Sequence, residues 1–248
     1  MRRHPSSFGS TSFSFGPGPL SNALKAIIAA NVLMFLVQQV APQVRLWLGL
    51  IPSTALGELW LWQLATYMFL HGGVFHLLFN MLALWMFGTE LERIWGTRYF
   101  VKFYMLTGLG AGALTVIFSL LPFDATQQLY HAIVIGASGS IYGLLLAYAL
   151  YFPDRPIYMY FVFPIPAKYF VMIMGALAFY SSLAESGGVA SATHLGGLVV
   201  GYVMLKGTRF HPLAEVKYRY LKWKINRMRK RFDVYSGGRA DDWDRRVH

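Results

Sequence analysis

The sequence predicts an all-α polytopic membrane protein whose helices cross the bilayer six times. Hydrophobic residues make up 56% of the 248 residues and charged residues only 13%, and the mean hydropathy is +0.44, which is too apolar for an ordinary soluble domain. The apolar residues also gather into runs, most of them close to the roughly 20 residues that a helix needs to cross a bilayer core. The chain has no cysteine, which excludes disulfides, thiolate catalysis and thiolate metal sites.

The N-terminal part of the chain combines a polar tail, a first span and an interfacial segment. Residues 1–20 are rich in Ser, Gly, Phe and Pro and show no helical period, so they are predicted to be a disordered cytoplasmic tail. Residues 23–40 form an apolar run of spanning length. Residues 41–68 are apolar but are broken by prolines and charged side chains, and they contain three tryptophans. Because tryptophan favours the headgroup level, this segment is predicted to lie in the membrane interface.

Five further spans complete a predicted membrane core at residues 21–206. They are expected over residues 69–91, 100–121, 136–152, 166–184 and 189–205. The fourth of the six spans is short for a full crossing, because it stops at Pro153. Its N-terminus, which carries Ser138, is therefore expected to lie below the membrane surface.

The basic residues orient this core. An even number of spans places both termini on one side of the membrane, and only Arg45 among the basic residues falls in a segment assigned to the other side. The positive-inside rule makes the basic side cytoplasmic. Both termini are therefore predicted in the cytoplasm, Ser138 opens toward the exterior half, and the predicted location is the inner, plasma membrane of a bacterium.

The C-terminal tail, residues 207–248, is strongly basic and accounts for much of the net charge of +11. Four apolar residues recur in it at helical spacing, namely Leu221, Ile225, Met228 and Phe232. Two interpretations stand side by side: a basic amphipathic helix bound to anionic lipid headgroups, or a solvated tail that stops translocation. No nucleic acid partner is expected, because the charge clusters directly after the last span.

Two polar residues inside the apolar runs carry the candidate chemistry. Ser138 is flanked by glycines and His194 lies in the sixth run, and polar side chains at such positions are functional candidates. A serine with a histidine base is the minimum for acyl transfer, in which His194 takes the serine proton and returns it to the leaving amine. No acidic residue lies at a suitable depth to orient the imidazole, so the sequence predicts a dyad. Tyr142, one turn after Ser138, is expected to pack against the histidine ring.

Small residues give these two spans a way to meet. Gly139 and Gly143 are four residues apart on the fourth span, and Gly197 and Gly201 repeat this spacing on the sixth. Faces of this kind allow two helix backbones to approach closely in a membrane. The pattern therefore predicts that the fourth and sixth spans pack at these glycines and bring the serine and histidine together.

The second span has a polar face. His76 and Asn80 are four residues apart and share one side of a helix, while His71 lies more than one turn earlier. The side chains of His76 and Asn80 and the backbone N–H of Ser138 are candidate donors to the oxyanion of a tetrahedral intermediate. The alternatives are hydrogen bonds between helices and a zinc site on His71 and His76. Zinc is disfavoured by the five-residue spacing and the lack of a third ligand, and neither metal nor cofactor is expected.

Several motifs fall in a consistent order on the predicted spans. They are HxxxxHxxxN at His71, His76 and Asn80; GASG from Gly136, with Tyr142 four residues after Ser138; AxHxxG from Ala192 through His194 to Gly197, followed by Gly201; and ExxxG at Glu92 and Gly96. Together they cover residues 24–206 and resemble the rhomboid family of intramembrane serine proteases.

The resemblance implies a six-span bundle in which residues 41–68 form a membrane-dipping interfacial hairpin. The roles it implies are nucleophile for Ser138, base for His194, oxyanion stabilisation for His76 and Asn80, and structural support for His71, Glu92, Gly96, Gly136, Gly139, Gly143, Gly197 and Gly201. Substrates would be membrane proteins anchored by a single span and cut in or near the membrane, without a cofactor. One departure is visible, because many relatives have Trp-Arg where this chain has Trp62-Gln63. A salt bridge that would stabilise the hairpin is therefore expected to be missing.

Two other classes of function compete with a protease. A catalytically silent relative would bind and escort membrane proteins, but such relatives typically lack the serine or the histidine, and this chain keeps both. A small transporter would use His76 and Asn80 as a relay. The sequence has no inverted repeat and no acidic residue on that pathway to support transport.

Overall fold

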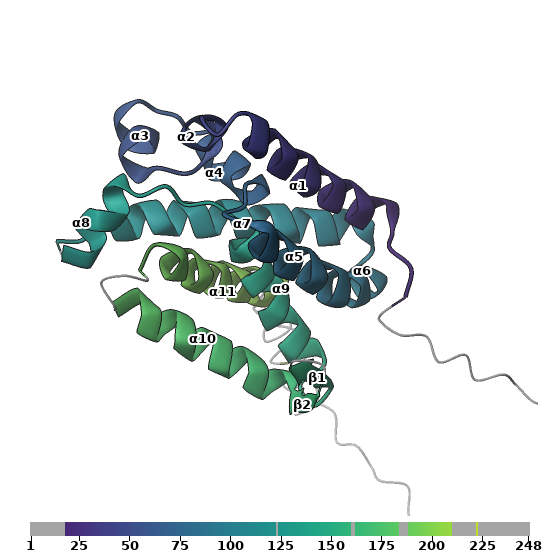
Figure 1. Cartoon of the computed structure of the whole chain (residues 1–248). Helices are drawn as coiled ribbons and strands as arrows, with labels where there is room; N and C mark the ends of the chain where they lie inside the picture. The colour runs from purple at the N-terminus through teal and green to yellow at the C-terminus, as the bar shows by residue number, and fades with distance from the viewer. Residues whose placement is uncertain (1–17, 123, 160–161, 184–187, 210–221, 223–248) are drawn as a thin grey trace, which may run out of the picture. The chain divides into compact units, whose positions relative to one another are not determined.

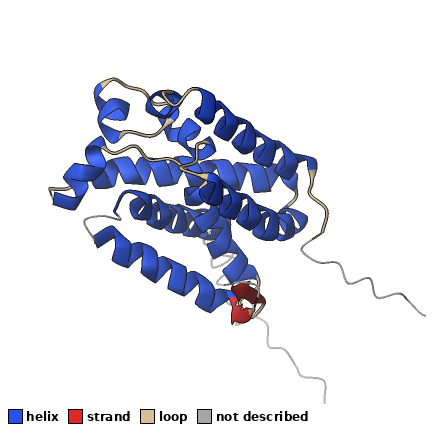
Figure 2. Ribbon diagram, in the orientation of Figure 1, coloured by secondary structure: helices blue, strands red, loops and turns tan. Residues whose placement is uncertain are grey.

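The computed structural model describes residues 18–122, 124–159, 162–183, 188–209 and 222. These residues are mostly helical, with one two-stranded antiparallel sheet (Figure 1, Figure 2). Residues up to Leu205 belong to one compact unit. Most of the N-terminal tail, and the four apolar positions of the predicted amphipathic helix in the C-terminal tail, lie outside the described residues.

Among the residues that the structure describes, three helical stretches are long and apolar enough to cross a membrane, and they correspond to the first three predicted spans. The first is α1 (Asn22–Val40), whose N-terminus is capped by Ser21: the Oγ atom accepts a hydrogen bond from Leu24 N at 3.1 Å. The helix ends at Val40 with Ala41 as its C-cap, and the next residue, Pro42, cannot donate a backbone hydrogen bond. The second and third are Val74–Trp95 and Thr97–Ser119.

Short helices fill the segment after α1. They are α2 (Val44–Leu48), α3 (Pro52–Gly57), α4 (Gln63–Thr66) and the 3-10 turn η1 (Tyr67–Phe69). Gln63 is buried and joins three of these parts: its Oε1 accepts from Ile51 N at 3.1 Å and Thr54 Oγ1 at 3.0 Å, and its Nε2 donates to Leu46 O at 3.2 Å. Where the resemblance led us to expect a missing salt bridge, a neutral amide thus links the segment through three hydrogen bonds.

The second span begins later than predicted. It consists of α5 (Val74–Ala83), the π-helical turn η2 (Leu84–Gly88) and α6 (Thr89–Trp95), which together form one rod. The sequence predicts a start at residue 69, but residues 70–73 are not helical. Two consecutive glycines, which weaken a helix, account for the difference. His71 therefore precedes the helix rather than standing on it.

The remaining elements follow in order. They are α7 (Thr97–Ser119), α8 (Asp124–His131), α9 (Ser138–Tyr151), β1 (Pro156–Met159), β2 (Phe163–Pro166), α10 (Ala167–Leu183) and α11 (Gly188–Arg209). The sequence did not predict α8 or the hairpin of β1 and β2, in which Pro156 pairs with Pro166. Both lie in connections that are too short to give a clear periodic signal.

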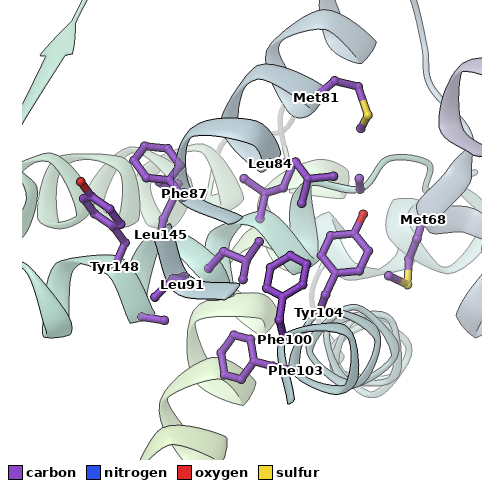
Figure 3. Packing of buried hydrophobic residues seen from close by; sticks show 14 of the residues in the cluster. Met68, Met81, Leu84, Phe87, Leu91, Phe100, Phe103, Tyr104, Leu145 and Tyr148 are labelled. Atoms are coloured by element: carbon purple, nitrogen blue, oxygen red, sulfur yellow. The ribbon is translucent and has the colours of Figure 1, made fainter. Parts of the chain in front are cut away.

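Helix α9 runs through the middle of the unit (Figure 1). Ten of its 14 residues are buried, which is the mark of an interior helix that is apolar on every side. Large side chains fill the space where it meets the rod and α7 (Figure 3). They include Leu84, Phe87 and Leu91 from the rod, Phe100, Phe103 and Tyr104 from α7, and Leu145 and Tyr148 from α9. At about 21 Å, α9 is shorter than the roughly 30 Å of a bilayer core.

Glu92 connects the beginnings of two helices to α6. Its carboxylate is buried and accepts from Ser21 Oγ and from Thr97 Oγ1, each at 2.6 Å. The next turn ends at Gly96, whose φ of +75° favours glycine. The ExxxG pair thus shapes the junction between α6 and α7 and holds the start of α1 against it.

Glu92→Ala is expected to lower the free energy of unfolding by at least about 2 kcal/mol, because two hydrogen bonds to a charged group are lost and two hydroxyls lose their acceptor. The measurement is thermal unfolding in detergent. Glu90→Ala is the matched control on the same helix. Its carboxylate binds Arg93 at 3.0 Å and Arg155 at 3.2 Å. Both arginine side chains are about half exposed, so about 1 kcal/mol or less is expected. Equal losses from the two variants would contradict the structural role of Glu92.

Candidate active site

Ser138 and His194 lie within hydrogen-bond distance. Ser138 is the first residue of α9 and His194 stands on α11, and the Oγ atom of the serine is 2.8 Å from Nε2 of the histidine. The imidazole ring stacks on Tyr142, with ring centroids 4.2 Å apart and planes 7° from parallel. A general base must reach the proton that it removes, and this geometry meets that requirement.

Glycines allow the close approach of α9 and α11. A Cβ atom built on Gly201 would lie 2.9 Å from the Cα atom of Gly143, and one built on Gly197 would overlap the carbonyl oxygen of Gly139. Helix α11 is also tied to α7, because the hydroxyl groups of Thr193 and Thr115 are 2.9 Å apart. Thr193, Gly197 and Gly201 follow one another at intervals of four residues and so share one side of α11. The close backbone contacts at the two glycines set the distance between α11 and α9, and with it the position of His194.

The backbone before Ser138 is held by two contacts with earlier parts of the chain. Val134 and Leu50 exchange hydrogen bonds of 2.8 and 2.9 Å, and Gly136 N donates to Tyr67 O at 3.0 Å. Gly136 has a φ of +130°, which side chains rarely adopt. A Cβ atom there would also lie 2.9 Å from both Cε1 and Nε2 of His76. Glycine thus lets the edge of the His76 ring approach the residue two positions before the serine.

His76 has a defined hydrogen-bonding environment. Its Nδ1 accepts from Gly72 N at 3.3 Å, which assigns the proton of a neutral ring to Nε2, the nitrogen that faces Gly136. Asn80 donates from Nδ2 to His76 O at 2.7 Å, and an amide nitrogen carries a second N–H. His71 is fully buried and meets the His76 ring edge to face, with centroids 5.0 Å apart. His71 is thus a packing neighbour of the site.

Two other predicted positions lie away from this group. Glu92 and Gly96 belong to the far end of the rod, and Glu92 follows His76 by 16 residues, about 24 Å along a helix.

Within the described ranges, no cluster of three or more His, Cys, Asp or Glu side chains is arranged to hold a metal ion.

Sequence reasoning missed Gln38, a buried residue of α1 whose side chain pairs with the backbone of His71. A signal was present, because Gln38 is a polar side chain in an apolar run. The same rule that singled out His76 and Asn80 applies to it.

Comparison with known proteins identifies the family. A family model described as the Rhomboid domain matches residues 58–209, more than half of the chain. The chain belongs to the rhomboid family. Family membership and the three helices of spanning length make this rhomboid a multi-pass integral membrane protein.

Several curated proteins resemble this rhomboid. It is 35% identical over 135 residues to Rhomboid protein 1, mitochondrial, of Saccharomyces cerevisiae, covering 54% of this chain and 38% of that protein. It is 32% identical over 141 residues to Rhomboid protease GluP of Bacillus subtilis, covering 57% and 25%. It is 31% identical over 151 residues to Rhomboid protease AarA of Providencia stuartii, covering 56% and 53%. The matched part of the chain thus spans between 25% and 53% of these three relatives.

Proposed function

We propose that this rhomboid is an intramembrane serine endopeptidase that works through a dyad of Ser138 and His194. The observation that carries the proposal is the 2.8 Å distance between Ser138 Oγ and His194 Nε2, with the imidazole held against Tyr142. The existence of relatives named as proteases supports the same class of reaction.

The proposed reaction has two stages. Ser138 Oγ attacks the carbonyl carbon of the scissile peptide bond while His194 Nε2 takes the serine proton. The tetrahedral intermediate then expels the amine, which receives that proton from His194, and an acyl-enzyme remains. In the second stage His194 removes a proton from water, the resulting hydroxide attacks the ester, and the carboxylic acid product leaves with Ser138 protonated again.

The negative oxygen of each intermediate needs hydrogen-bond donors that are already in place. Three candidate donors lie at the serine itself or on α5, the helix that carries His76 and Asn80. They are the backbone N–H of Ser138 at the N-terminus of α9, the Nε2–H of His76 and the second N–H of the Asn80 amide.

The membrane arrangement extends this proposal. We place six spans in the core at residues 21–206, with both termini in the cytoplasm and residues 41–68 as an interfacial hairpin. A stack of Trp47, Trp60 and Trp62 supports the interfacial position: successive ring centroids are 5.3 and 5.4 Å apart, and Trp47 and Trp62 are about half exposed. The basic C-terminal tail would contact anionic headgroups of the cytoplasmic leaflet. Substrates would be proteins with a single span, cut where that span reaches the serine.

A serine-directed fluorophosphonate tests the proposal in the detergent-solubilised protein. Labelling is expected in the wild type, detected by mass spectrometry on Ser138, and is expected to disappear in Ser138→Ala. Ser140→Ala is the matched control: this buried serine stands two residues later and donates to Tyr104 O at 2.8 Å, so its loss should leave labelling intact. A folded wild type that takes no label would refute the proposal and favour a silent escort protein.

A further inference from the structure

Gln38 makes a two-point contact with a backbone segment far from it in the sequence. This α1 residue is only 1% exposed. Its Oε1 accepts from His71 N at 3.0 Å, and its Nε2 donates to His71 O at 3.2 Å. The side-chain amide therefore satisfies both backbone groups of one residue, as a neighbouring strand would.

The segment that Gln38 contacts needs such a partner. Residues 70–73 lie between η1 and α5 and are not helical. The ends of this segment still bond to those elements, through Leu70 N to Tyr67 O at 3.2 Å and Leu77 N to Gly73 O at 3.0 Å, whereas both backbone groups of His71 bond to Gln38. Non-helical backbone at membrane depth is stable only where protein or water supplies those bonds. This requirement alone would give Gln38 a role in stability.

The next contact links Gln38 to the candidate oxyanion site. The carbonyl of His71 and the N–H of Gly72 belong to one planar peptide group, and in a trans peptide they point in opposite directions. Gln38 binds the carbonyl side of this group at 3.2 Å, and His76 Nδ1 accepts from the N–H side at 3.3 Å. The peptide plane is thus held between the glutamine and the imidazole.

Two consequences follow for His76. A fixed Gly72 N–H keeps Nδ1 as the acceptor and Nε2 as the protonated nitrogen, and it fixes the rotation of the ring. Hydrogen bonds in series also polarise one another, so donation from Gln38 to the carbonyl strengthens the N–H as a donor. The edge of the His76 ring that carries Cε1 and Nε2 faces Gly136, two residues before Ser138.

We propose that Gln38 is a positioning residue for the oxyanion site. Gln38 acts on His76 through the peptide group between His71 and Gly72. The inference rests on the proposed protease function. It assigns a role in the reaction to a residue of the first span. Among the hydrogen bonds of the described residues, those of the Gln38 side chain join it to His71, and none joins it to Ser138 or His194.

The test compares Gln38→Met, which keeps the length of the side chain and removes both hydrogen bonds, with Gln39→Met. Gln39 is the matched control, because its amide binds only Phe35 O on its own helix, at 3.3 Å, among the described contacts. With a purified single-span substrate in detergent, Gln38→Met is expected to lower kcat by about 10- to 100-fold with KM nearly unchanged, since misplacing one transition-state donor costs about that much. Gln39→Met should behave as the wild type.

A second arm separates positioning from stability. In a His76→Ala background the positioned ring is absent, so adding Gln38→Met should lower the residual kcat no further. Losses that multiply in the double variant, or a wild-type kcat in folded Gln38→Met, would overturn the inference. If Gln38→Met does not fold, Gln38→Glu takes its place, because a protonated carboxyl group keeps one donor and one acceptor, and its kcat should fall as the pH rises. Failure of the wild type to label with fluorophosphonate would instead refute the protease function itself.

Discussion

His194→Ala is expected to lower kcat for cleavage of a single-span membrane protein by about 10⁴-fold or more. Without the imidazole, no group accepts the proton of Ser138 during attack or returns it to the leaving amine, and loss of such a base in serine proteases has effects of that size. The fold should survive, because the ring is only partly buried and its removal leaves the glycine contacts of α11 in place. The measurement is single-turnover cleavage of a purified substrate in proteoliposomes.

The adjacent residue provides a control for this experiment. Thr193→Val keeps the shape of the side chain and removes the hydroxyl that lies 2.9 Å from Thr115 Oγ1. Such a hydrogen bond between membrane helices contributes about 0.6 kcal/mol, so a small fall in the unfolding temperature and an unchanged kcat are expected. If His194→Ala kept substantial activity, another group would have to serve as the base and the dyad would be wrong.

The apolar pattern predicted the spans well where polar breaks were far apart. The first and third matched to within a few residues, because Pro42 and the Gly96 turn give sharp ends to long apolar runs. The second was wrong at its start, since hydropathy does not distinguish a helix from an apolar loop such as residues 70–73. Deviations inside a helix, such as the π-helical turn η2, arise from packing and leave no periodic signal.

The candidate site was predictable in its residues and less so in its geometry. Spacing alone indicated that the glycine faces of α9 and α11 meet, and their backbones do approach there. The sequence did not indicate that one peptide group would be held between Gln38 and His76. Gln38 and His71 are 33 positions apart, and the peptide group belongs to a non-helical segment. Such pairing depends on how α1 packs, which no local pattern encodes.

Gly197→Ala is expected to separate α9 from α11 and to reduce both stability and reactivity. The new methyl group would overlap the carbonyl oxygen of Gly139 and lie 2.9 Å from its carbonyl carbon, and backbone atoms cannot rotate away as a flexible side chain can. Overpacking of this kind costs about 1–3 kcal/mol. Ser138 stands one residue before Gly139, so a shift of the backbone also stretches the 2.8 Å contact with His194.

The expected loss of reactivity in Gly197→Ala follows from the geometry of proton transfer. A displacement of about 1 Å can lower a rate by about 100-fold, so the rate of fluorophosphonate labelling on Ser138 should fall by that order while the unfolding temperature drops by several degrees. Gly57→Ala in α3 is the control, because among the described residues no atom lies within 4 Å of a Cβ atom built there. Wild-type labelling in a folded Gly197→Ala protein would mean that the close contact of α9 and α11 is not what brings the serine and the histidine together.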